Sequence, residues 1–349
     1  GALPEVIEND ANNTDALAQV IEVGTTINGR SNGGADVDFF KFTAKKGQRI
    51  LIVCEALRID SRFQGELRLY NTEGRRLSRV VAQLRRDDPL LDFTVPADGD
   101  YLLRVSDFVY GGGNDYVYRL KVSTGPHIDF VVPPAGVPGT TGKFTLYGRN
   151  LPGSQTAEIG DDGQQLEKLD VQITLPKTPD VLESGSSRLS REGTVDGSTY
   201  TFKGANGISN PVTIAFSSQA LTLEAEPNNE IAQSQKISLP ADISGSFGSV
   251  RDVDRFEFEA KAKDVFWIEV FAQQLGNFSD PYLTLDGVTK KDDGTETLKR
   301  ITAQDDVATN ALVSLFDTDT SDVAYRFAVP SDGLYRITLR DRFYESRGA

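Results

Sequence analysis

Short apolar runs, many of them alternating with polar residues, recur along most of the chain. Val, Ile, Leu, Phe and Tyr dominate segments such as 49–55, 66–70, 93–107 and 116–122. Alternation with a period of two places one set of side chains on each face of a β-strand. Turns rich in Gly, Asp and Asn separate these segments about every ten residues, as in antiparallel sandwiches. The pattern predicts an all-β protein, with helical periodicity only within 13–20, where it would make one or two turns.

The polar positions contain a duplication. An acidic segment that opens at Glu8 returns at Glu224, and a short strand that opens at Asp36 returns at Asp252. Both 224 − 8 and 252 − 36 equal 216, so the two elements keep one spacing without a gap. The chain therefore holds two copies of one module, which argues against a single catalytic domain.

Later positions of the two copies match at a second offset. Tyr101 pairs with Tyr335, an offset of 335 − 101 = 234, so the second copy carries 234 − 216 = 18 extra residues within about 290–322. At this offset Tyr116, which opens the closing strand of the first copy, would match position 350, beyond Ala349. We expect the last strand of the second copy to be missing.

A different unit separates the copies. Its Pro- and Gly-rich turns and short strands, over roughly a hundred residues, are typical of an immunoglobulin-like sandwich. The predicted architecture is therefore two jelly-roll-type β-sandwiches flanking an immunoglobulin-like β-sandwich. The predicted domains are 1–124, 125–222 and 223–349.

The composition disfavours some classes of binding partner and some kinds of catalytic or metal site. The net charge of −14 repels phosphate backbones and anionic headgroups, so we expect neither nucleic acid binding nor membrane insertion. The only cysteine, Cys54, and the only histidine, His127, make a conventional zinc site or a Ser-His-Asp triad implausible, so both residues are interpreted as structural. We predict a protein that is not an enzyme. A glycosidase remains an alternative, but its catalytic acids would have to lie outside the duplicated positions.

The duplicated acids predict a metal site. Strand alternation places Asp36 and Asp38 on the same face as Phe40 and Phe42, which should be the core face. Carboxylates at the end of a core face are costly unless a cation or several donors compensate them. The acidic segment supplies further oxygens, and Ca²⁺ takes six to eight oxygen ligands. The predicted calcium ligands share a carboxylate or amide oxygen and occur in both copies: Glu8, Asp10, Asn12, Asn13, Asp36, Asp38, Glu224, Glu226, Asn228, Asn229, Asp252 and Asp254.

An alternative explanation needs no metal. Asn12 and Asn13 could cap a short helix while the aspartates accept backbone N–H groups at turns. Which asparagine of each pair is a ligand stays open. Another acidic stretch, 317–322, begins like an EF-hand loop but has Asp322 where that loop needs Gly and Ala328 where it needs Glu. We expect a solvated loop there.

Three motifs in order carry a family resemblance. The acidic opening E-x-[D/E]-x-N-N-x-x-A, the strand D-x-D-x-F-x-F and the closing P-x-D-G-x-Y resemble the bacterial pre-peptidase C-terminal domain, which is itself similar to the collagen-binding modules of clostridial collagenases. The middle unit, with Pro133-Pro134, Gly139 and the segment 146–153, resembles the immunoglobulin-like IPT/TIG domain. The resemblance implies secreted β-sandwiches, often appended to peptidases, that commonly bind calcium through the acidic opening and nearby aspartates.

These observations lead to one expected function and one alternative. The expected protein is a non-catalytic, calcium-stabilised module that binds an extracellular polymer, either protein or polysaccharide, or targets a larger exported protein. Its expected location is secreted, periplasmic or on the cell surface. The alternative is a passive spacer or folding aid within a secreted peptidase or other hydrolase.

Overall fold

The computed structural model describes residues 3–82, 88–160, 163–180, 189–306 and 318–343. Strands dominate these residues, and the helical segments described are 3-10 helices of three to five residues. The predicted all-β, sandwich-type fold is confirmed. None of the described helices has the length and apolar character needed to cross a membrane.

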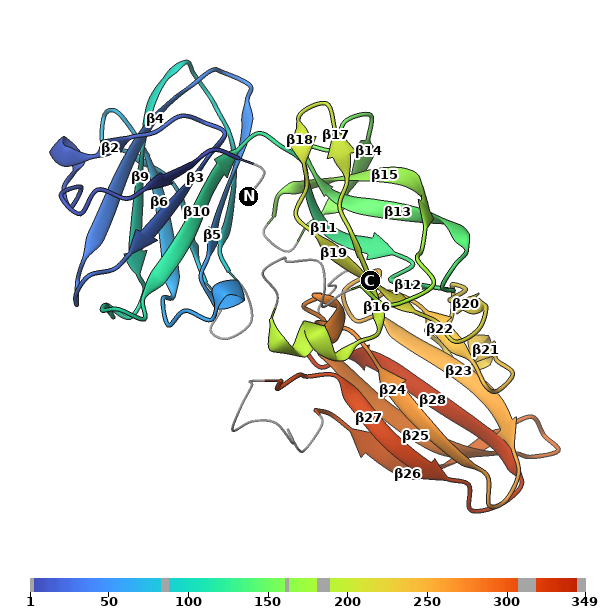
Figure 1. Cartoon of the computed structure of the whole chain (residues 1–349). Coiled ribbons are helices and arrows are strands. Elements are labelled where there is room, and N and C mark those ends of the chain that lie inside the picture. The colour runs from blue at the N-terminus through green and yellow to red at the C-terminus, as the bar shows by residue number, and fades with distance from the viewer. Residues whose placement is uncertain (1–2, 83–87, 161–162, 181–188, 307–317, 344–349) are drawn as a thin grey trace.

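Two five-stranded sheets form the first unit (Figure 1). The first sheet has the order β1 (Glu5–Ile7), β3 (Thr25–Arg30), β10 (Val117–Ser123), β5 (Arg49–Glu55) and β8 (Leu90–Thr94). The second has the order β2 (Gln19–Val20), β4 (Val37–Ala44), β9 (Gly99–Asp107), β6 (Gly65–Asn71) and β7 (Arg76–Val81).

Alternating strand residues build the core between these sheets. Phe40 and Phe42 on β4 are buried, while the intervening Lys41 is exposed, as strand alternation predicts. Leu120 on β10 lies in the same core and is fully buried. Cys54 on β5 is also part of this core and is a free, buried thiol, as predicted.

The middle unit also packs two sheets. One is four-stranded, with β11 (His127–Val132), β13 (Thr141–Arg149), β15 (Gln165–Thr174) and β14 (Gln155–Ile159). The other has β12 (Ala135–Gly136), β19 (Val212–Phe216) and β16 (Gly197–Tyr200), and a small ribbon pairs β17 (Lys203–Gly204) with β18 (Gly207–Ile208).

The third unit repeats the first with one difference. Its five-stranded sheet, β21 (Gln235–Lys236), β23 (Val253–Ala260), β28 (Gly333–Asp341), β25 (Pro281–Lys290) and β26 (Glu296–Gln304), matches the second sheet of the first unit strand for strand. The other sheet is present as two separate pairs, β20 (Leu221–Leu223) with β22 (Asp242–Ser244) and β24 (Val265–Val270) with β27 (Val323–Ala328). Among the described residues no strand corresponds to β10. The position expected to hold it, 350, follows residues 344–349, which lie outside the described part.

The offsets found in the sequence are visible in side-chain contacts. The Tyr101 hydroxyl donates to the Ala97 carbonyl at 2.7 Å, and the Tyr335 hydroxyl donates to Ser331 at 2.6 Å. The β25–β26 turn repeats the backbone bonds of the β6–β7 turn, with Lys291 in the place of Asn71. The offset is 291 − 71 = 220 at the turn, and it is 304 − 80 = 224 on the returning strand, where Val80 pairs with Leu67 and Gln304 pairs with Leu283. Four extra residues therefore lengthen each arm of this hairpin, and the other ten of the 18 follow it.

The predicted short helix is present but is capped differently. The 3-10 helix η1 (Asp15–Leu17) follows Thr14, and η4 (Ile231–Gln233) follows Glu230, whose side chain forms a capping box with Gln233. Neither Asn12 nor Asn13 occupies the cap position. The other 3-10 helices are η2 (Leu57–Ile59), η3 (Ser190–Thr194) and η5 (Gln273–Leu275).

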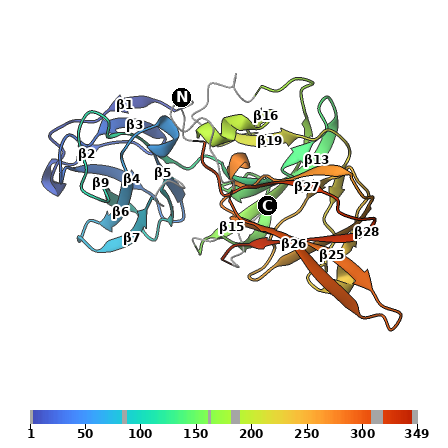
Figure 2. The same ribbon diagram turned by 90° about the horizontal axis from the view of Figure 1, so that it is seen from below.

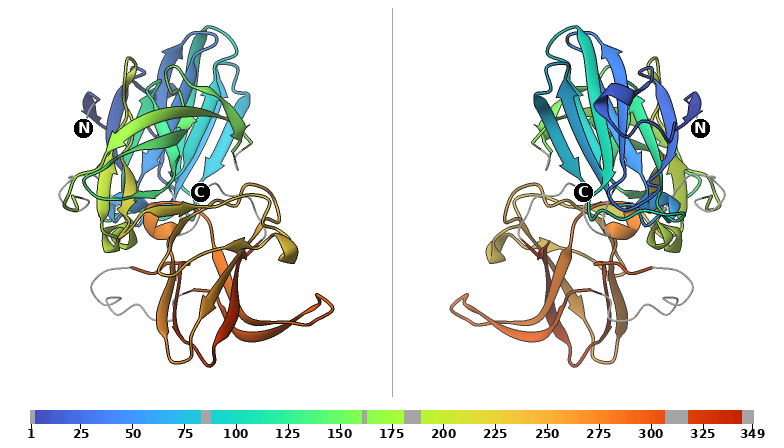
Figure 3. Two further views of the ribbon diagram at one scale, coloured as in Figure 1. Left: turned by 90° about the vertical axis from the view of Figure 1, so that its right-hand side faces the viewer. Right: turned by 90° about the vertical axis from the view of Figure 1, so that its left-hand side faces the viewer.

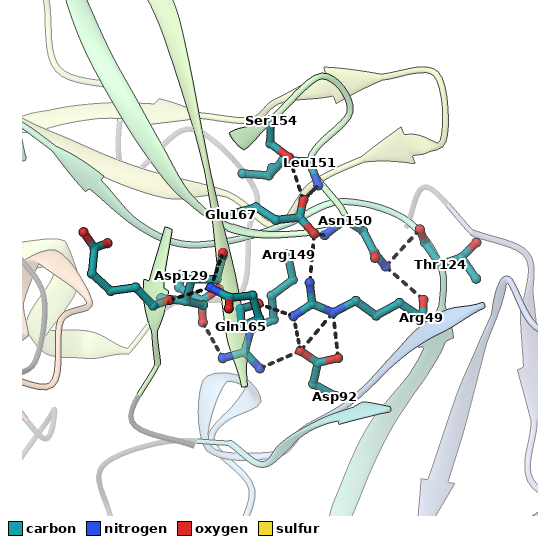
Figure 4. A network of polar contacts seen from close by, with 12 residues as sticks. Arg49, Asp92, Thr124, Asp129, Arg149, Asn150, Leu151, Ser154, Gln165 and Glu167 are labelled. Carbon is teal, nitrogen blue, oxygen red and sulfur yellow. Dashed lines mark hydrogen bonds and ion pairs between the residues drawn. The ribbon is translucent and has the colours of Figure 1, made fainter. Parts of the chain in front are cut away.

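The three units are arranged around the middle one. Figures 1 and 2 place the first sandwich to one side of the other two, and Figure 3 places the third sandwich below them. Arg49 of β5 joins the first and middle units, because its guanidinium contacts Asp92 Oδ2 at 2.5 Å and Glu167 Oε1 at 2.8 Å (Figure 4). Arg149 of the middle unit contacts the same Asp92 at 3.5 Å. The Asp92 side chain, only 1% exposed, is therefore compensated from both units.

Candidate metal centre

The first aspartate of each D-x-D strand binds backbone. Asp36 accepts the N–H groups of Asn32 at 2.6 Å and Val37 at 3.0 Å. Its counterpart Asp252 accepts those of Gly248 at 2.6 Å and Val253 at 3.1 Å. Both oxygens of each carboxylate are thus engaged in the turn that precedes the strand, which is the role that the metal-free alternative assigned to these residues.

The second aspartate of each strand lies on the core face. Asp38 is 2% exposed and Asp254 is 4% exposed. Each precedes two buried phenylalanines at alternate positions, so the period of the strand carries these carboxylates inside the rim of the sandwich. They need compensation there, and the two units provide it in different ways.

In the first unit protein groups compensate Asp38. The buried Tyr118 hydroxyl on β10 donates to Asp38 Oδ2 at 2.7 Å. The Asn12 side-chain amide lies 2.7 Å from the Asn9 carbonyl and 3.3 Å from Asp38 Oδ1, and it would donate to both with its nitrogen turned toward them. Burial and a shared hydrogen bond with Glu8 raise the pKa of Asp38 to about 9.

In the third unit three carboxylates converge. Glu224, Glu226 and Asp254 each offer one oxygen, and these oxygens all lie within 4.8 Å of one another. Two buried oxygens of this group, Asn228 Oδ1 and Asp254 Oδ1, have no hydrogen-bond partner among the described residues. Buried oxygens of this kind are rare without a water or an ion, so the donor set fits a hard cation.

Backbone and amide donors position these carboxylates. Ser246 N–H donates to Glu224 Oε2 at 2.8 Å, and the Asn228 amide donates to Glu224 Oε1 at 2.7 Å. Asn228 N–H donates to Glu226 at 2.9 Å. Burial and a shared hydrogen bond with Glu224 raise the pKa of Asp254 to about 10. Without a cation the cluster retains a proton, because three negative charges so close together repel one another.

The remaining predicted ligands have other partners. In the first unit Asp10 and Asn13 are exposed, and Glu8 accepts Arg30 N–H at 2.8 Å. In the third unit Asn229 Oδ1 accepts Val253 N–H at 2.7 Å. Among the described acids of the first unit, no three bring oxygens as close together as in the third. The twelve predicted residues therefore separate into one compact oxygen cluster and several structural groups.

Sequence reasoning did not identify Tyr118 or a duplicated pair of buried aspartates. Asp88 accepts the three N–H groups of residues 56–58 at 2.7–3.2 Å, and Asp322 accepts those of residues 272–274 at 2.8–2.9 Å. The expected solvated loop at 317–322 is wrong for Asp322, which is 1% exposed. Asp317 lies outside the described residues. The offset 322 − 88 = 234 in the sequence could have revealed this pair.

A second acidic group and a cavity at the junction of the units are weaker candidates for a functional site. Asp280, Asp305 and Asp306 also approach one another, but Arg342 pairs with Asp305 and supplies a cation from the protein itself. A cavity where the three units meet, lined by Arg58, Asp129, Glu192 and others, holds about 50 Å³. Sites for small-molecule substrates usually measure roughly 300–1,000 Å³.

Comparisons with known proteins found solved structures of low similarity to this chain. No protein-family model and no curated protein matches it. The pre-peptidase C-terminal domain of a collagenase from Bacillus anthracis matches at 21% identity, covering 30% of this chain and 93% of that domain, with a TM-score of 0.25. A periplasmic inhibitor of g-type lysozyme from Salmonella Typhimurium matches at 19% identity, covering 30% of this chain and 98% of that one, with a TM-score of 0.22. A catalytic domain with two carbohydrate-binding modules from Clostridium perfringens matches at 11% identity over 89% of this chain and 33% of that one, with a TM-score of 0.20.

Proposed function

We propose that this chain is a non-catalytic binding module of an extracellular or cell-surface protein, and that one Ca²⁺ ion stabilises its third unit. The supporting observation is the cluster of Glu224, Glu226 and Asp254, whose oxygens lie within 4.8 Å of one another. Ca²⁺ binds oxygen at 2.3–2.6 Å, so two ligands of one ion can be up to about 5 Å apart. The oxygens of the cluster already lie within this distance of one another.

The proposed ion joins two parts of the third unit. Glu224 and Glu226 belong to the segment before η4, whereas Asp254 lies on β23. The ion would replace the retained proton, neutralise the buried carboxylates and hold the opening segment against the sheet. Asn228 Oδ1, for which the described part of the chain offers no hydrogen-bond partner, is the proposed amide ligand. This role is structural and requires no reaction at the metal.

The first unit is proposed to bind calcium weakly or not at all. The Tyr118 hydroxyl donates to Asp38, and the Asn12 amide would supply a second donor with its nitrogen turned toward that carboxylate. These donors would take the place of a cation. Millimolar calcium is typical of extracellular fluids, and modules there bind it at roughly 10⁻⁴–10⁻³ M. A site of this affinity would be filled in such fluids, which supports the proposed location outside the cytoplasm, whether secreted, periplasmic or on the cell surface.

Thermal unfolding in Ca²⁺, Mg²⁺ or EGTA tests the metal site. Ten millimolar Ca²⁺ should stabilise the wild type by roughly 1.4–2.7 kcal/mol for a dissociation constant of 0.1–1 mM. Asp254→Asn should abolish this gain, whereas the matched variant Asp38→Asn should keep it. A wild type that melts identically in Ca²⁺ and EGTA, or an Asp254→Asn variant that keeps the full gain, would contradict the proposal.

The proposed partner is an extracellular polymer, either a protein or a polysaccharide. The three motifs that resemble the pre-peptidase C-terminal domain support this part of the proposal, and the net charge of −14 disfavours anionic partners. Co-sedimentation with insoluble collagen, chitin and cell-wall material tests it. We expect the protein to be retained on one of these solids, and we expect soluble fragments of that polymer to release it.

The ion-pair network of Figure 4 favours a second candidate, a spacer that holds flanking domains apart. Arg49 and Arg149 converge on one buried carboxylate across the junction, which limits independent motion of the first and middle units. Absence of retention on every polymer, together with a single rigid shape in small-angle X-ray scattering, would favour this function over polymer binding.

A further inference from the structure

Three arginines stand in one row on the outer face of the second sheet of the first unit. Arg104 of β9 faces Arg68 of β6, and Arg68 faces Arg79 of β7. Leu67 and Leu69, on either side of Arg68, are fully buried, so strand alternation turns the arginines away from the core. Because neighbouring strands lie about 4.8 Å apart, these residues, called the arginine row below, span about 10 Å.

The arginine row contains two like-charged pairs in succession. Like charges directly opposite each other destabilise a sheet unless other groups compensate them. The corresponding sheet of the third unit shows the alternating arrangement, since Asp286 faces both Arg336 and Arg300. In the arginine row no acidic residue separates the three positive charges. The row therefore needs negative charge from outside its own positions.

One buried carboxylate, that of Glu66, supplies part of this charge. Its Oε1 accepts Arg68 Nη2 at 2.9 Å and Arg79 Nε at 2.6 Å, and Arg104 Nη1 lies 3.6 Å from its Oε2. A carboxylate accepts about four hydrogen bonds, whereas three guanidiniums offer about fifteen N–H groups. Two buried nitrogens, Arg68 Nε and Arg104 Nη1, have no hydrogen-bond partner among the described residues. The four side chains keep 3 − 1 = 2 net positive charges and donors that the protein does not use.

The third unit does not repeat the arginine row. At the corresponding positions of its sheet Thr338 faces Thr284, and Thr284 faces Ala303. Residues that both copies share build the common framework, whereas this charged row occurs in only one of them. The sandwich therefore forms without the row, and a binding role explains why the first unit keeps three costly charges side by side.

The arginine row lies on the side of the first unit that faces away from the middle unit. Arg49, which contacts the middle unit, is on the outer face of the other sheet, and Figures 1 and 2 place β5 nearer to the middle unit than β9. The side chains of Arg68 and Arg79 are 28% and 41% exposed. A ligand can therefore reach the row without any movement of the units.

Two partly buried aromatic rings border the arginine row. Phe39 of β4 faces Arg104 and so continues the row, and Tyr70 lies two positions beyond Arg68 on the same face of β6. Arginine binds carboxylate and sulfate-like groups through paired N–H bonds, and aromatic rings pack against flat apolar surfaces. Arg104 and Arg68 stand on strands with a neighbour on both sides, so they offer no backbone edge to which a peptide could add a strand. Acidic sugars suit this face better, because side-chain contacts alone can bind them.

We propose that the arginine row binds the carboxylate or sulfate groups of an acidic polysaccharide. The arginines hold the acidic groups through charge-assisted hydrogen bonds, and Phe39 and Tyr70 pack against the sugar rings. This inference rests on the proposed polymer binding and narrows its partner to one class of polysaccharide. The net charge of −14 repels polyanions from the chain as a whole, so binding depends on direct contact with the row.

Titration calorimetry of the whole chain with hexasaccharides tests the inference. The probes are oligogalacturonate, which carries carboxylates, heparin, which also carries sulfates, and neutral maltohexaose. At least one acidic probe should bind in EGTA with one site per chain, and maltohexaose should not bind. An increase of NaCl from about 50 mM to about 500 mM should weaken this binding about tenfold, because salt screens exposed charges.

Matched variants locate the site. Arg104→Thr and Arg68→Thr each introduce the residue that the third unit carries at that position, and each should weaken binding of the acidic probe about tenfold. Glu66→Gln removes the competing carboxylate and should strengthen binding about threefold, a gain that loss of folding cannot produce. Arg326→Thr removes the same charge at an exposed position of β27 in the third unit and should leave binding unchanged.

Three results would overturn the inference. One is the absence of binding by both acidic hexasaccharides up to millimolar concentration. A second is equal weakening by Arg326→Thr and Arg104→Thr, which would indicate attraction to any positive charge. A third is equal binding of a hexa-aspartate peptide, because the row would then recognise negative charge without regard to sugar. Retention on collagen or chitin without binding of either acidic hexasaccharide would overturn this inference and leave the proposed polymer binding intact, so the two failures are distinguishable.

Discussion

Arg58 and Gln274 occupy equivalent positions in the two repeated units and contact the same 3-10 helix of the middle unit. Arg58 Nη1 donates to Glu192 Oε1 at 3.0 Å, and Gln274 Nε2 donates to Thr194 Oγ1 at 2.6 Å. Their offset, 274 − 58 = 216, is that of the acidic motif. The two copies therefore dock on η3 through the same turn, η2 in one unit and η5 in the other.

The Arg58–Glu192 pair should couple the first and middle units measurably. The Glu192 side chain is 4% exposed and that of Arg58 is 28% exposed, so the interaction is partly screened by solvent. A double-mutant cycle with Arg58→Ala and Glu192→Gln should give a coupling free energy of about 1 kcal/mol in urea unfolding. Gln274→Ala, which leaves this pair intact, should show no coupling to Glu192→Gln. Additive effects of Arg58→Ala and Glu192→Gln would show that the contact does not join the units.

The buried aspartates Asp88 and Asp322 should be equivalent determinants of stability. Each accepts three backbone N–H groups at the start of a 3-10 helix, so replacement by Ala leaves three buried or partly buried donors without an acceptor. We expect Asp88→Ala and Asp322→Ala each to reduce the free energy of unfolding by about 2–3 kcal/mol in calorimetry. Asn at either position keeps one acceptor and should cost less.

Asp322→Ala also separates this structural role from an EF-hand-like one. The stabilisation by Ca²⁺ should be the same in Asp322→Ala as in the wild type, since the carboxylate binds backbone N–H groups. Loss of the calcium response in this variant, with little loss of stability in EGTA, would contradict the capping role.

The sequence was sufficient for the strands and for the duplication. Period-two alternation places Phe40 and Phe42 in the core whatever else surrounds them, and constant offsets reveal the repeated framework. The predicted domain boundaries stay predictions. Strand β20 (Leu221–Leu223) pairs with β22 of the third unit and crosses the predicted boundary between 222 and 223.

The sequence could not distinguish the two acid clusters. Asp38 and Asp254 lie in the same motif, and what distinguishes them is Tyr118, 80 residues beyond Asp38 on a strand with no described counterpart. Asp322 was mistaken for a loop residue because its donors, the N–H groups of residues 272–274, lie 48–50 residues away. Local composition carries no information about such distant partners.

His127 should make the protein less stable in mild acid. Burial, together with the nearby cations Arg149, Lys121 and Arg58, lowers the pKa of His127 to about 3, from an ordinary value of 6.5. Between these two values the unfolded chain binds a proton that the folded protein excludes, so the free energy of unfolding falls as pH falls below 6.5. Relative to His127→Gln, the wild type should lose roughly 1–2 kcal/mol between pH 6.5 and pH 5 in urea unfolding. His127→Asn, a second neutral replacement, should behave like His127→Gln. Parallel pH profiles for the wild type and both variants would mean that His127 accepts a proton in the folded state as readily as in the unfolded chain.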